Sequence, residues 1–336
     1  MRLLIDPDPP RLRWSKDAVE TGGVPLGEAS SISYRLHHGG ERLREPATRV
    51  TPESLAAVRS VIRYRPEHNS LTYEAACRML RLLPDVPQFF LCDTAFFSSL
   101  PEEASVYAVP SALRSRGVRR YGGNGLHHRW AWQRTRELCG QGVSRVISIR
   151  LGDRSDVAAL RDGAPVDTTL GFSPVEGLLS RTGCGDIDAS VVFELRTAGL
   201  SLSEINDLLS RRSGFRALVG PRCGFKELSA PSGGADRALA REMLLYGVVK
   251  CAGGFAALLG GADVVAIAAE SPSASTRFVW ELCRRLGALG LGCRRRMPLK
   301  DGAVLSDRGS AVKAVFLEAD LWRSMAWQAA VAEKEG

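Results

Sequence analysis

The chain has 336 residues, of which 45% are hydrophobic and 24% charged, as in ordinary globular proteins, and its length predicts about two domains. Its net charge of +8 comes largely from arginine, but no zinc finger, RNP motif or basic zipper accompanies the arginine runs, so we expect no nucleic-acid partner. No apolar run approaches the roughly 20 residues that span a bilayer and the N-terminus lacks a signal peptide's apolar core, so we expect a cytoplasmic protein without a membrane partner.

The first third of the chain alternates short strands with amphipathic helices. In chain order, the predicted elements are a strand at 2–5, a strand at 31–36, a helix at 51–64, a helix at 72–83 and a strand at 89–92. The prolines between residues 7 and 10 should end the first strand, because proline cannot donate to a strand ladder. Thr51 suits the N-cap of the first helix. The last strand ends on Asp93, as a buried strand does when it offers a carboxylate to a site.

After about residue 95 the pattern restarts. Strands are predicted at 145–151, 157–160, 264–268 and 312–317, and helices at 203–211, 236–260 and 275–288. Strands that alternate with helices in two similar halves indicate a two-lobed α/β fold with a cleft between the lobes. We expect an N-terminal lobe of residues 1–95, joined by a C-terminal helix at 320–336, and a C-terminal lobe of residues 96–319.

The eight cysteines show no Cys-x-x-Cys spacing and mostly stand beside apolar or small residues. This pattern predicts buried free thiols rather than a metal site. Cys184 is set apart from the others because it falls inside a motif, Arg181-Thr182-Gly183-Cys184-Gly185-Asp186.

Several motifs of the chain resemble the acetate kinase family. They are Cys92-Asp93-Thr94-Ala95-Phe96-Phe97, Pro101-Glu102-Glu103-Ala104, Arg119-Arg120-Tyr121-Gly122, the segment 166–177 and Gly185-Asp186-Ile187-Asp188. The resemblance extends over residues 31–320. It implies an actin-like ATPase fold and the transfer of a phosphoryl group from ATP, with Mg²⁺, to a small carboxylic acid, which gives an acyl phosphate. It also implies a homodimer formed through the C-terminal lobe.

The substrate side of the family's site is partly retained. Phosphoryl transfer needs positive charge and hydrogen-bond donors around the transferred group, and Arg35 matches the arginine that holds the carboxylate and the phosphoryl group. Asp93 matches the aspartate that organises metal and substrate, and His68 matches a histidine at the mouth of the same pocket. Asn124 replaces the histidine that contacts the phosphoryl group, and an amide donates hydrogen bonds but moves no proton at pH 7.

The pocket that holds the methyl group of acetate in the family is altered. Its two aliphatic residues fall on His37 and Glu67 and its aromatic residue on Gly123, while Pro174 is kept. Loss of the aromatic side chain enlarges the pocket, and polar groups without partners are costly beside a methyl group. The expected substrate is therefore a larger or more polar acid than acetate, such as a cationic or hydroxylated carboxylic acid.

The family's first nucleotide-binding loop, which is rich in hydroxyl side chains, is replaced by Asp6-Pro7-Asp8-Pro9-Pro10-Arg11-Leu12-Arg13. The resemblance makes Asp6 a candidate metal ligand, and Arg13 keeps a positive charge for the nucleotide. The prolines, however, remove backbone donors that a phosphate group needs.

The other nucleotide motifs diverge further. Three matching segments contain the remaining candidates for cofactor binding, which are Arg150, Gly152, Asp153, Lys226 and Glu270. An arginine at position 154 replaces a phosphate-loop glycine. The family's second catalytic arginine falls on Gly183, and Arg181 is its nearest substitute. Glu318 and Asp320 are the candidates for the magnesium carboxylate.

Three functions stay open at this point. The first is a carboxylate kinase of the acetate kinase type that uses ATP. The second is a catalytically impaired relative that binds a metabolite or a protein. The third is an acyl-phosphate hydrolase that works without ATP. The retained Arg35, His68 and Asp93 favour a working substrate pocket, whereas the altered phosphate loops favour loss of nucleotide use.

Overall fold

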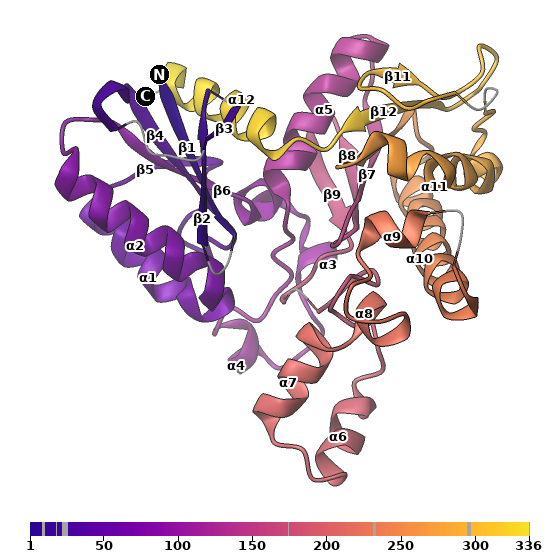
Figure 1. Ribbon diagram of the computed structural model, residues 1–336, viewed down its shortest axis with the longest axis horizontal. Helices are drawn as coiled ribbons and strands as arrows, with labels where there is room; N and C mark the ends of the chain where they lie inside the picture. The colour runs from indigo at the N-terminus through magenta and orange to yellow at the C-terminus, as the bar shows by residue number, and fades with distance from the viewer. Residues whose placement is uncertain are drawn as a thin grey trace. The chain divides into compact units, whose positions relative to one another are not determined.

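The structure is a computed structural model. It describes residues 1–8, 11–17, 19–21, 26–173, 175–230, 233–293 and 297–335. The chain divides into two compact units: unit 1 comprises Met1–Trp130 and Asp320–Gly336, and unit 2 comprises Ala131–Ala319. Each unit contains a six-stranded sheet with helices packed against it (Figure 1). The predicted α/β class is therefore confirmed.

The sheet of unit 1 has the strand order β3-β2-β1-β4-β6-β5. Its strands are β1 (Arg2–Asp8), β2 (Arg11–Lys16), β3 (Val19–Thr21), β4 (Ser31–Leu36), β5 (Ala47–Arg49) and β6 (Gln88–Cys92). β1, β4 and β6 run parallel, and the other neighbours are antiparallel. Because the C-terminal ends of parallel strands meet at one edge of a sheet, this arrangement brings Asp6, Arg35 and Asp93 together.

The prediction that β1 ends at residue 5 is wrong. The strand continues through Pro7 because it forms an antiparallel hairpin with β2, in which Pro7 lies opposite Leu12 and Asp6 lies opposite Arg13. In the described part of the chain, β4 pairs with β1 over Arg2–Ile5. The last part of β1 is therefore an edge on its β4 side, where a proline without an N–H is tolerated.

Helices cover both faces of this sheet. α1 (Pro52–Val61) and α2 (Pro66–Leu82) pack on the face that carries Leu3 and Ile5. α12 (Leu321–Glu335) packs on the opposite face, against Leu4 and Leu91. Since successive strand residues point to opposite faces, Leu3, Leu4 and Ile5 are all buried.

The start of α1 is as predicted from the sequence, whereas the start of α2 is not. Thr51 caps α1 through a capping box with Ser54, as predicted. α2 begins at Pro66 rather than at residue 72, and this earlier start places Glu67 and His68 in its first turn.

The sequence predicts a lobe boundary after residue 95, whereas unit 1 extends to Trp130. The contacts of the intervening residues account for the difference. The Tyr121 ring packs on His38, and Leu126 joins the buried cluster around Leu4. Residues 320–336 lie with unit 1.

The sheet of unit 2 has the strand order β11-β12-β10-β7-β8-β9. Its strands are β7 (Arg145–Leu151), β8 (Asp156–Arg161), β9 (Ala164–Thr168), β10 (Val264–Ala269), β11 (Ala303–Val304) and β12 (Lys313–Glu318). Its helices include α6 (Ser190–Thr197), α7 (Leu202–Arg211), α8 (Gly214–Leu218), α9 (Phe225–Ser229), α10 (Ala235–Leu259) and α11 (Pro272–Arg285). β10 is buried along its whole length, as expected of a central parallel strand.

α10 is long and apolar enough to cross a membrane by length and composition alone. It corresponds to the helix predicted at 236–260. Its buried residues, among them Leu244, Val248 and Phe255, belong to the core of unit 2, and the helix contacts β7 and β8. We therefore assign α10 to the core of this unit.

Candidate functional site

Arg35 lies at the centre of a polar cluster in unit 1. Its three nitrogen atoms donate to three acceptors: Nε to Asp93 Oδ2 (2.8 Å), Nη1 to Asp6 Oδ1 (3.3 Å) and Nη2 to Asn124 Oδ1 (3.2 Å). We call Arg35 and these three partners the Arg35 cluster. Burial alone would lower the pKa of the guanidinium, but Asp93 and Asp6 raise it, so Arg35 stays charged. A guanidinium has five N–H groups, which leaves Arg35 donors for a ligand.

Asp93 connects Arg35 to the start of α5 (Gly125–Cys139). One carboxylate oxygen accepts from Arg35, and the other accepts from the backbone N–H of Leu126 (3.3 Å), in the first turn of the helix. Carboxylates at a helix N-terminus satisfy backbone N–H groups that have no partner inside the helix. His37 Nδ1 lies 3.8 Å from the oxygen that Arg35 contacts. This buried carboxylate therefore positions Arg35 from a fixed point in the fold.

Asp6 lies between two arginines. Arg35 Nη1 is 3.3 Å from Oδ1, and Arg13 Nη1 is 3.8 Å from Oδ2. Burial raises the pKa of Asp6, and both arginines oppose this shift. Arg13 is held by Glu20, which accepts from Nε (3.0 Å) and Nη2 (2.6 Å), and its guanidinium lies over the Trp322 ring at 5.3 Å. Asp6, the candidate metal ligand, therefore already pairs with two cationic side chains.

Asn124 immediately precedes α5 and has a φ of +54°, a left-handed conformation that asparagine adopts more readily than most residues. Its backbone oxygen accepts from His127 N (3.0 Å) and His128 N (3.2 Å), which begins the helix. A Cβ on the next residue, Gly125, would lie 2.1 Å from Asp93 O. Only glycine allows the helix to approach Asp93 so closely.

The predicted pocket residues are only partly assembled. The His37 and His68 rings lie 4.2 Å apart, so the structure does bring the two histidines together beside Asp93. Glu67 is exposed in the first turn of α2, and Gly123 is buried. Pro174 lies outside the described residues.

His38, a neighbour of this site, was not singled out from the sequence. It stacks on Tyr64 at 4.5 Å with an interplanar angle of 23° and packs on Tyr121 at 4.5 Å. Its Nδ1 accepts from Gly40 N (3.1 Å). Burial and Arg65 lower the pKa of His38 to about 3, so the ring is neutral.

In unit 2, the charged side chains at the altered phosphate loop form ion pairs with one another. Arg150 Nη2 contacts Glu270 Oε1 (2.8 Å). Asp153 Oδ2 pairs with Arg181 Nη1 (3.1 Å), and its Oδ1 accepts from Phe225 N (2.7 Å) at the start of α9. The structure thus brings Arg150, Asp153 and Glu270 into one loop cluster, in which each arginine is paired with a carboxylate.

The remaining candidates are not among the paired residues of these clusters. Gly152 packs against Glu270, since a Cβ on it would lie 3.3 Å from Glu270 Oε1. Lys226 is exposed on α9. Asp320 accepts from Arg323 N (3.1 Å) and pairs with Arg323 at the start of α12, and Glu318 is half-buried at the end of β12. Within the described residues, no group of three or more His, Cys, Asp or Glu side chains could hold a metal ion.

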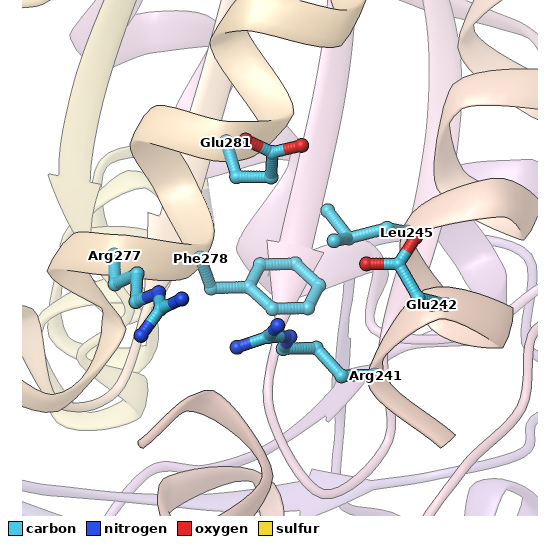
Figure 2. Close-up of a pocket in the computed structure, with 6 residues that line it drawn as sticks. All are labelled: Arg241, Glu242, Leu245, Arg277, Phe278 and Glu281. Carbon is cyan, nitrogen blue, oxygen red and sulfur yellow. The ribbon is translucent and has the colours of Figure 1, made fainter. Parts of the chain in front are cut away.

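Unit 2 contains a cavity of about 220 Å³ between α10 and α11. It is lined by Arg241, Glu242, Leu245, Arg277, Phe278 and Glu281 (Figure 2). Figure 2 shows the Phe278 ring between the two guanidinium groups and the two carboxylates. Both carboxylates contact Arg285, at 2.7 Å from Glu242 and 2.8 Å from Glu281. The cavity therefore presents mainly charged side chains, because Phe278 and Leu245 are buried behind them.

The sequence analysis missed Glu20, Trp322 and the cavity residues. Glu20 meets Arg13 only because β2 and β3 form a hairpin, and Trp322 reaches the same arginine from α12. No local sequence motif marks these contacts. They follow from the tertiary structure alone.

The chain matches the family model described as "Acetokinase family" over residues 23–322. An acetate kinase of Deinococcus radiodurans is 36% identical over 308 residues, which are 89% of this chain and 77% of that protein. An acetate kinase of Bacteroides thetaiotaomicron is 32% identical over 304 residues, which are 88% of this chain and 76% of that protein. The crystal structure of Porphyromonas gingivalis acetate kinase matches with a TM-score of 0.84 and 24% identity and covers 98% of both chains. The predicted fold is therefore confirmed.

Proposed function

Since the chain belongs to the acetokinase family, we propose that it transfers a phosphoryl group from ATP to the carboxylate of a small acid, which gives ADP and an acyl phosphate. The observation that carries the proposal is the Arg35 cluster. A buried arginine is held there by two carboxylates and an amide and keeps N–H donors for a ligand. A preorganised arginine of this kind stabilises the charge of a phosphoryl group during its transfer.

Each residue of the cluster has a role in this proposal. Arg35 binds the acid and the transferred group, and Asp93 orients Arg35 from the start of α5. Asn124 accepts from Arg35 through its carbonyl oxygen, so its amide N–H groups are its donors to a phosphoryl oxygen. The reaction needs no general base, because a carboxylate is already deprotonated at pH 7. The loss of the family's histidine at position 124 is therefore compatible with catalysis.

Among the described residues, no group of side chains forms a magnesium site. Both oxygens of Asp6 face arginines, and Asp320 is used at the start of α12. These residues do not fit Mg²⁺ as they stand, so we assign it no step. We propose it only as a counter-ion of ATP, since Mg²⁺ in kinases is held largely by phosphate oxygens and water.

We further propose that the substrate is a larger or more polar acid than acetate. The His37 ring, at a position where the family has an aliphatic residue, packs on the retained His68 beside Asp93, and Gly123 contributes no side chain. Imidazole groups can hydrogen-bond a hydroxyl or a second charged group of the substrate. An acid with such a group should be preferred to acetate.

The cavity between α10 and α11 supports a site for the base of a nucleotide. Arg241 and Arg277 line it, and guanidinium groups can stack on a flat heterocycle. The phosphate loop, however, pairs Arg150 with Glu270 and Arg181 with Asp153. ATP must separate these pairs to use the arginines, so we expect weak binding.

The same ion pairs favour a second candidate function. With its phosphate loop closed by carboxylates, the chain would bind a carboxylic acid or acyl phosphate at the Arg35 cluster without turnover. This alternative is a metabolite- or protein-binding relative of the kinases. It predicts acid binding that does not depend on ATP.

The proposal also includes the cellular location and the oligomeric state. We propose a cytoplasmic homodimer formed through unit 2, as the family resemblance implies. α6, α7 and α10 of this unit expose large apolar side chains, namely Phe193, Leu202, Leu239 and Tyr246, and exposed apolar surface of this kind marks interfaces. Light scattering after size-exclusion chromatography measures the oligomeric state.

The test combines binding and turnover. Calorimetry with ATP and Mg²⁺ measures nucleotide binding, and hydroxylamine trapping detects acyl phosphate from a panel of carboxylic acids. We expect turnover with at least one hydroxylated or charged acid and loss of at least a hundredfold in kcat/KM in Arg35→Ala. The matched control is Arg42→Ala, an exposed arginine outside the cluster, which should retain wild-type turnover.

The outcomes separate the two candidate functions. Turnover that disappears in Arg35→Ala and persists in Arg42→Ala supports the kinase. Intact turnover in Arg35→Ala would remove Arg35 from the site. Acid binding without ATP binding, even at millimolar ATP, would reject the kinase and support the binding protein.

A further inference from the structure

Two buried polar residues of α2, Asn69 and Thr72, donate hydrogen bonds to the backbone of the segment that carries Arg35. Thr72 Oγ1 donates to Arg35 O (2.8 Å), and Asn69 Nδ2 donates to His38 O (2.8 Å). The two side chains lie on one face of the helix, because residues three apart are neighbours on its surface. One face of α2 therefore contacts the end of β4 through polar groups.

The end of β4 needs such a donor because its pairing with β1 stops early. In the described part of the chain, β1 pairs with β4 as far as Tyr34, so the Arg35 carbonyl lies one residue beyond this pairing. The next carbonyl, that of Leu36, accepts from Asp93 N (2.9 Å) after the end of β6. A buried carbonyl requires a hydrogen-bond partner, and Thr72 supplies it for Arg35.

The buried face of α2 changes from polar to apolar along the helix. Its buried residues are Asn69, Thr72, Ala75, Ala76 and Met79, and the last three belong to the core of unit 1. Asn69 Oδ1 is buried and has no hydrogen-bond partner among the described residues, which costs stability. An apolar side chain would avoid this cost, so the amide of Asn69 points to a role other than stability.

The same segment is held from a second direction by the residue after Asp93. Gly39 N donates to Thr94 Oγ1 (2.9 Å). A Cβ on Gly39 would lie 2.6 Å from Cys92 Sγ, so the backbone runs close to the end of β6. The backbone of residues 35–39 is therefore bonded to side chains at three points.

We propose that Asn69 and Thr72 are positioning residues of the candidate site, which fix the backbone at the end of β4 and so the directions of the Arg35 guanidinium and the His37 ring. Asp93 holds the guanidinium of Arg35, and Thr72 holds its backbone. With both ends fixed, the remaining donors of Arg35 point in one direction. The effect on catalysis rests on the proposed function, whereas the effect on Arg35 itself does not.

Thr72→Val tests the proposal, since valine keeps the branched shape of threonine and lacks the hydroxyl group. The first readout is hydrogen exchange of Arg35 Nε–H with water, followed by NMR of the arginine Nε–H groups. The signal of Arg35 is identified by its absence in Arg35→Lys. The hydrogen bond to Asp93 should slow this exchange in the native chain, and we expect exchange about tenfold faster in Thr72→Val.

The second readout is turnover with the carboxylic acid that the native chain uses best, measured by hydroxylamine trapping. We expect kcat/KM to fall about tenfold in Thr72→Val, because a small misplacement of Arg35 weakens its contact with the reacting group. Thr72→Ser keeps the hydroxyl group and should restore both readouts. A purely structural role for Thr72 would not change the exchange of Arg35 Nε–H.

Thr135→Val is the matched control. Thr135 is completely buried, and its Oγ1 donates to Ala131 O in the same helix (2.7 Å). The substitution removes a comparable hydrogen bond and should lower the unfolding temperature, but it should leave both readouts unchanged. Asn69→Ala is a second test of the α2 contacts, with circular dichroism as the check on folding, and should also speed the exchange of Arg35 Nε–H.

The outcomes are distinct. Faster exchange and lower kcat/KM in Thr72→Val, both restored in Thr72→Ser, support the proposal. Native exchange at Arg35 in a folded Thr72→Val, or an unchanged kcat/KM, would overturn it, and native exchange in Asn69→Ala would remove Asn69 from it. If the native chain has no turnover, the proposed function fails, and the exchange measurements still decide whether α2 positions Arg35.

Discussion

Arg35 and His38 are three residues apart in the chain, yet Arg35 is charged and His38 is neutral. Arg35 is buried and stays charged because Asp6 and Asp93 contact it. His38 is buried more deeply, has aromatic neighbours, Tyr64 and Tyr121, and is neutral. The polar partners that the fold supplies, rather than burial itself, decide whether a side chain is ionised.

His38 should make the protein sensitive to acid. Its pKa in the folded chain is about 3, below the ordinary value of about 6.5. The unfolded chain therefore binds a proton that the folded chain does not, and stability, complete above pH 6.5, is lost as the pH falls toward 3. His38→Phe should reduce this loss by about 3 kcal/mol between pH 6.5 and 4. Urea unfolding at a series of pH values measures it.

Tyr64→Phe is the matched control for this prediction. It keeps the stacked ring beside His38 and should show the wild-type dependence on pH. An unchanged pH dependence in His38→Phe would mean that His38 is protonated in the folded chain.

At the scale of elements, the start of α5 organises the candidate site. Gly125 allows close contact with the backbone of Asp93, and Leu126 N then reaches the Asp93 carboxylate. The sequence predicted Asp93 at the end of a strand and Asn124 in a matching motif. It did not predict that the two residues join through the helix start and Arg35.

Features that depend on local sequence could be predicted, whereas features that depend on contacts in the folded chain could not. Thr51, the strand that ends at Cys92 and the long helices follow from local patterns of capping and hydrophobic spacing. The hairpin that carries β1 past Pro7 is set by pairing with β2, and the contact of Arg13 with Trp322 joins distant positions. Such pairings depend on the folded chain, so a single sequence without a local motif does not reveal them.

Gly125→Ala should separate α5 from Asp93. The added Cβ would lie 2.1 Å from Asp93 O, and relieving this contact should cost about 1–3 kcal/mol. We expect a lower unfolding temperature together with weaker acid binding, since Asp93 also orients Arg35. Calorimetry measures both. Gly142→Ala, where a Cβ meets nothing within 4 Å, is the control and should change neither property.

At the scale of the whole molecule, unit 1 is assembled from two distant parts of the chain. α12 supplies Trp322, Met325 and Ala329 to a buried cluster with Leu4 and Leu91. The N-terminal sheet therefore has one face that is covered by residues more than 200 positions away in sequence. Unit 2 lies between these parts in the chain and has its own core.

Met325→Ala tests whether the core of unit 1 depends on α12. Met325 is completely buried, so its truncation should lower the free energy of unfolding of unit 1 by about 2–5 kcal/mol. Arg323→Ala, on an exposed position of the same helix, should have a much smaller effect. Fluorescence-detected urea unfolding distinguishes the two variants. Equal midpoints would show that α12 does not contribute to the core of unit 1.

The position of α12 also bears on how the protein is made. During synthesis the ribosome delivers β1, β4 and β6 before unit 2, but the helix that covers Leu4 and Leu91 is made only after unit 2. One apolar face of the first sheet is therefore bare while the whole of unit 2 is translated, at about 5–20 residues per second. Nascent chains should recruit chaperones during this interval, and α12 then completes the folding of unit 1.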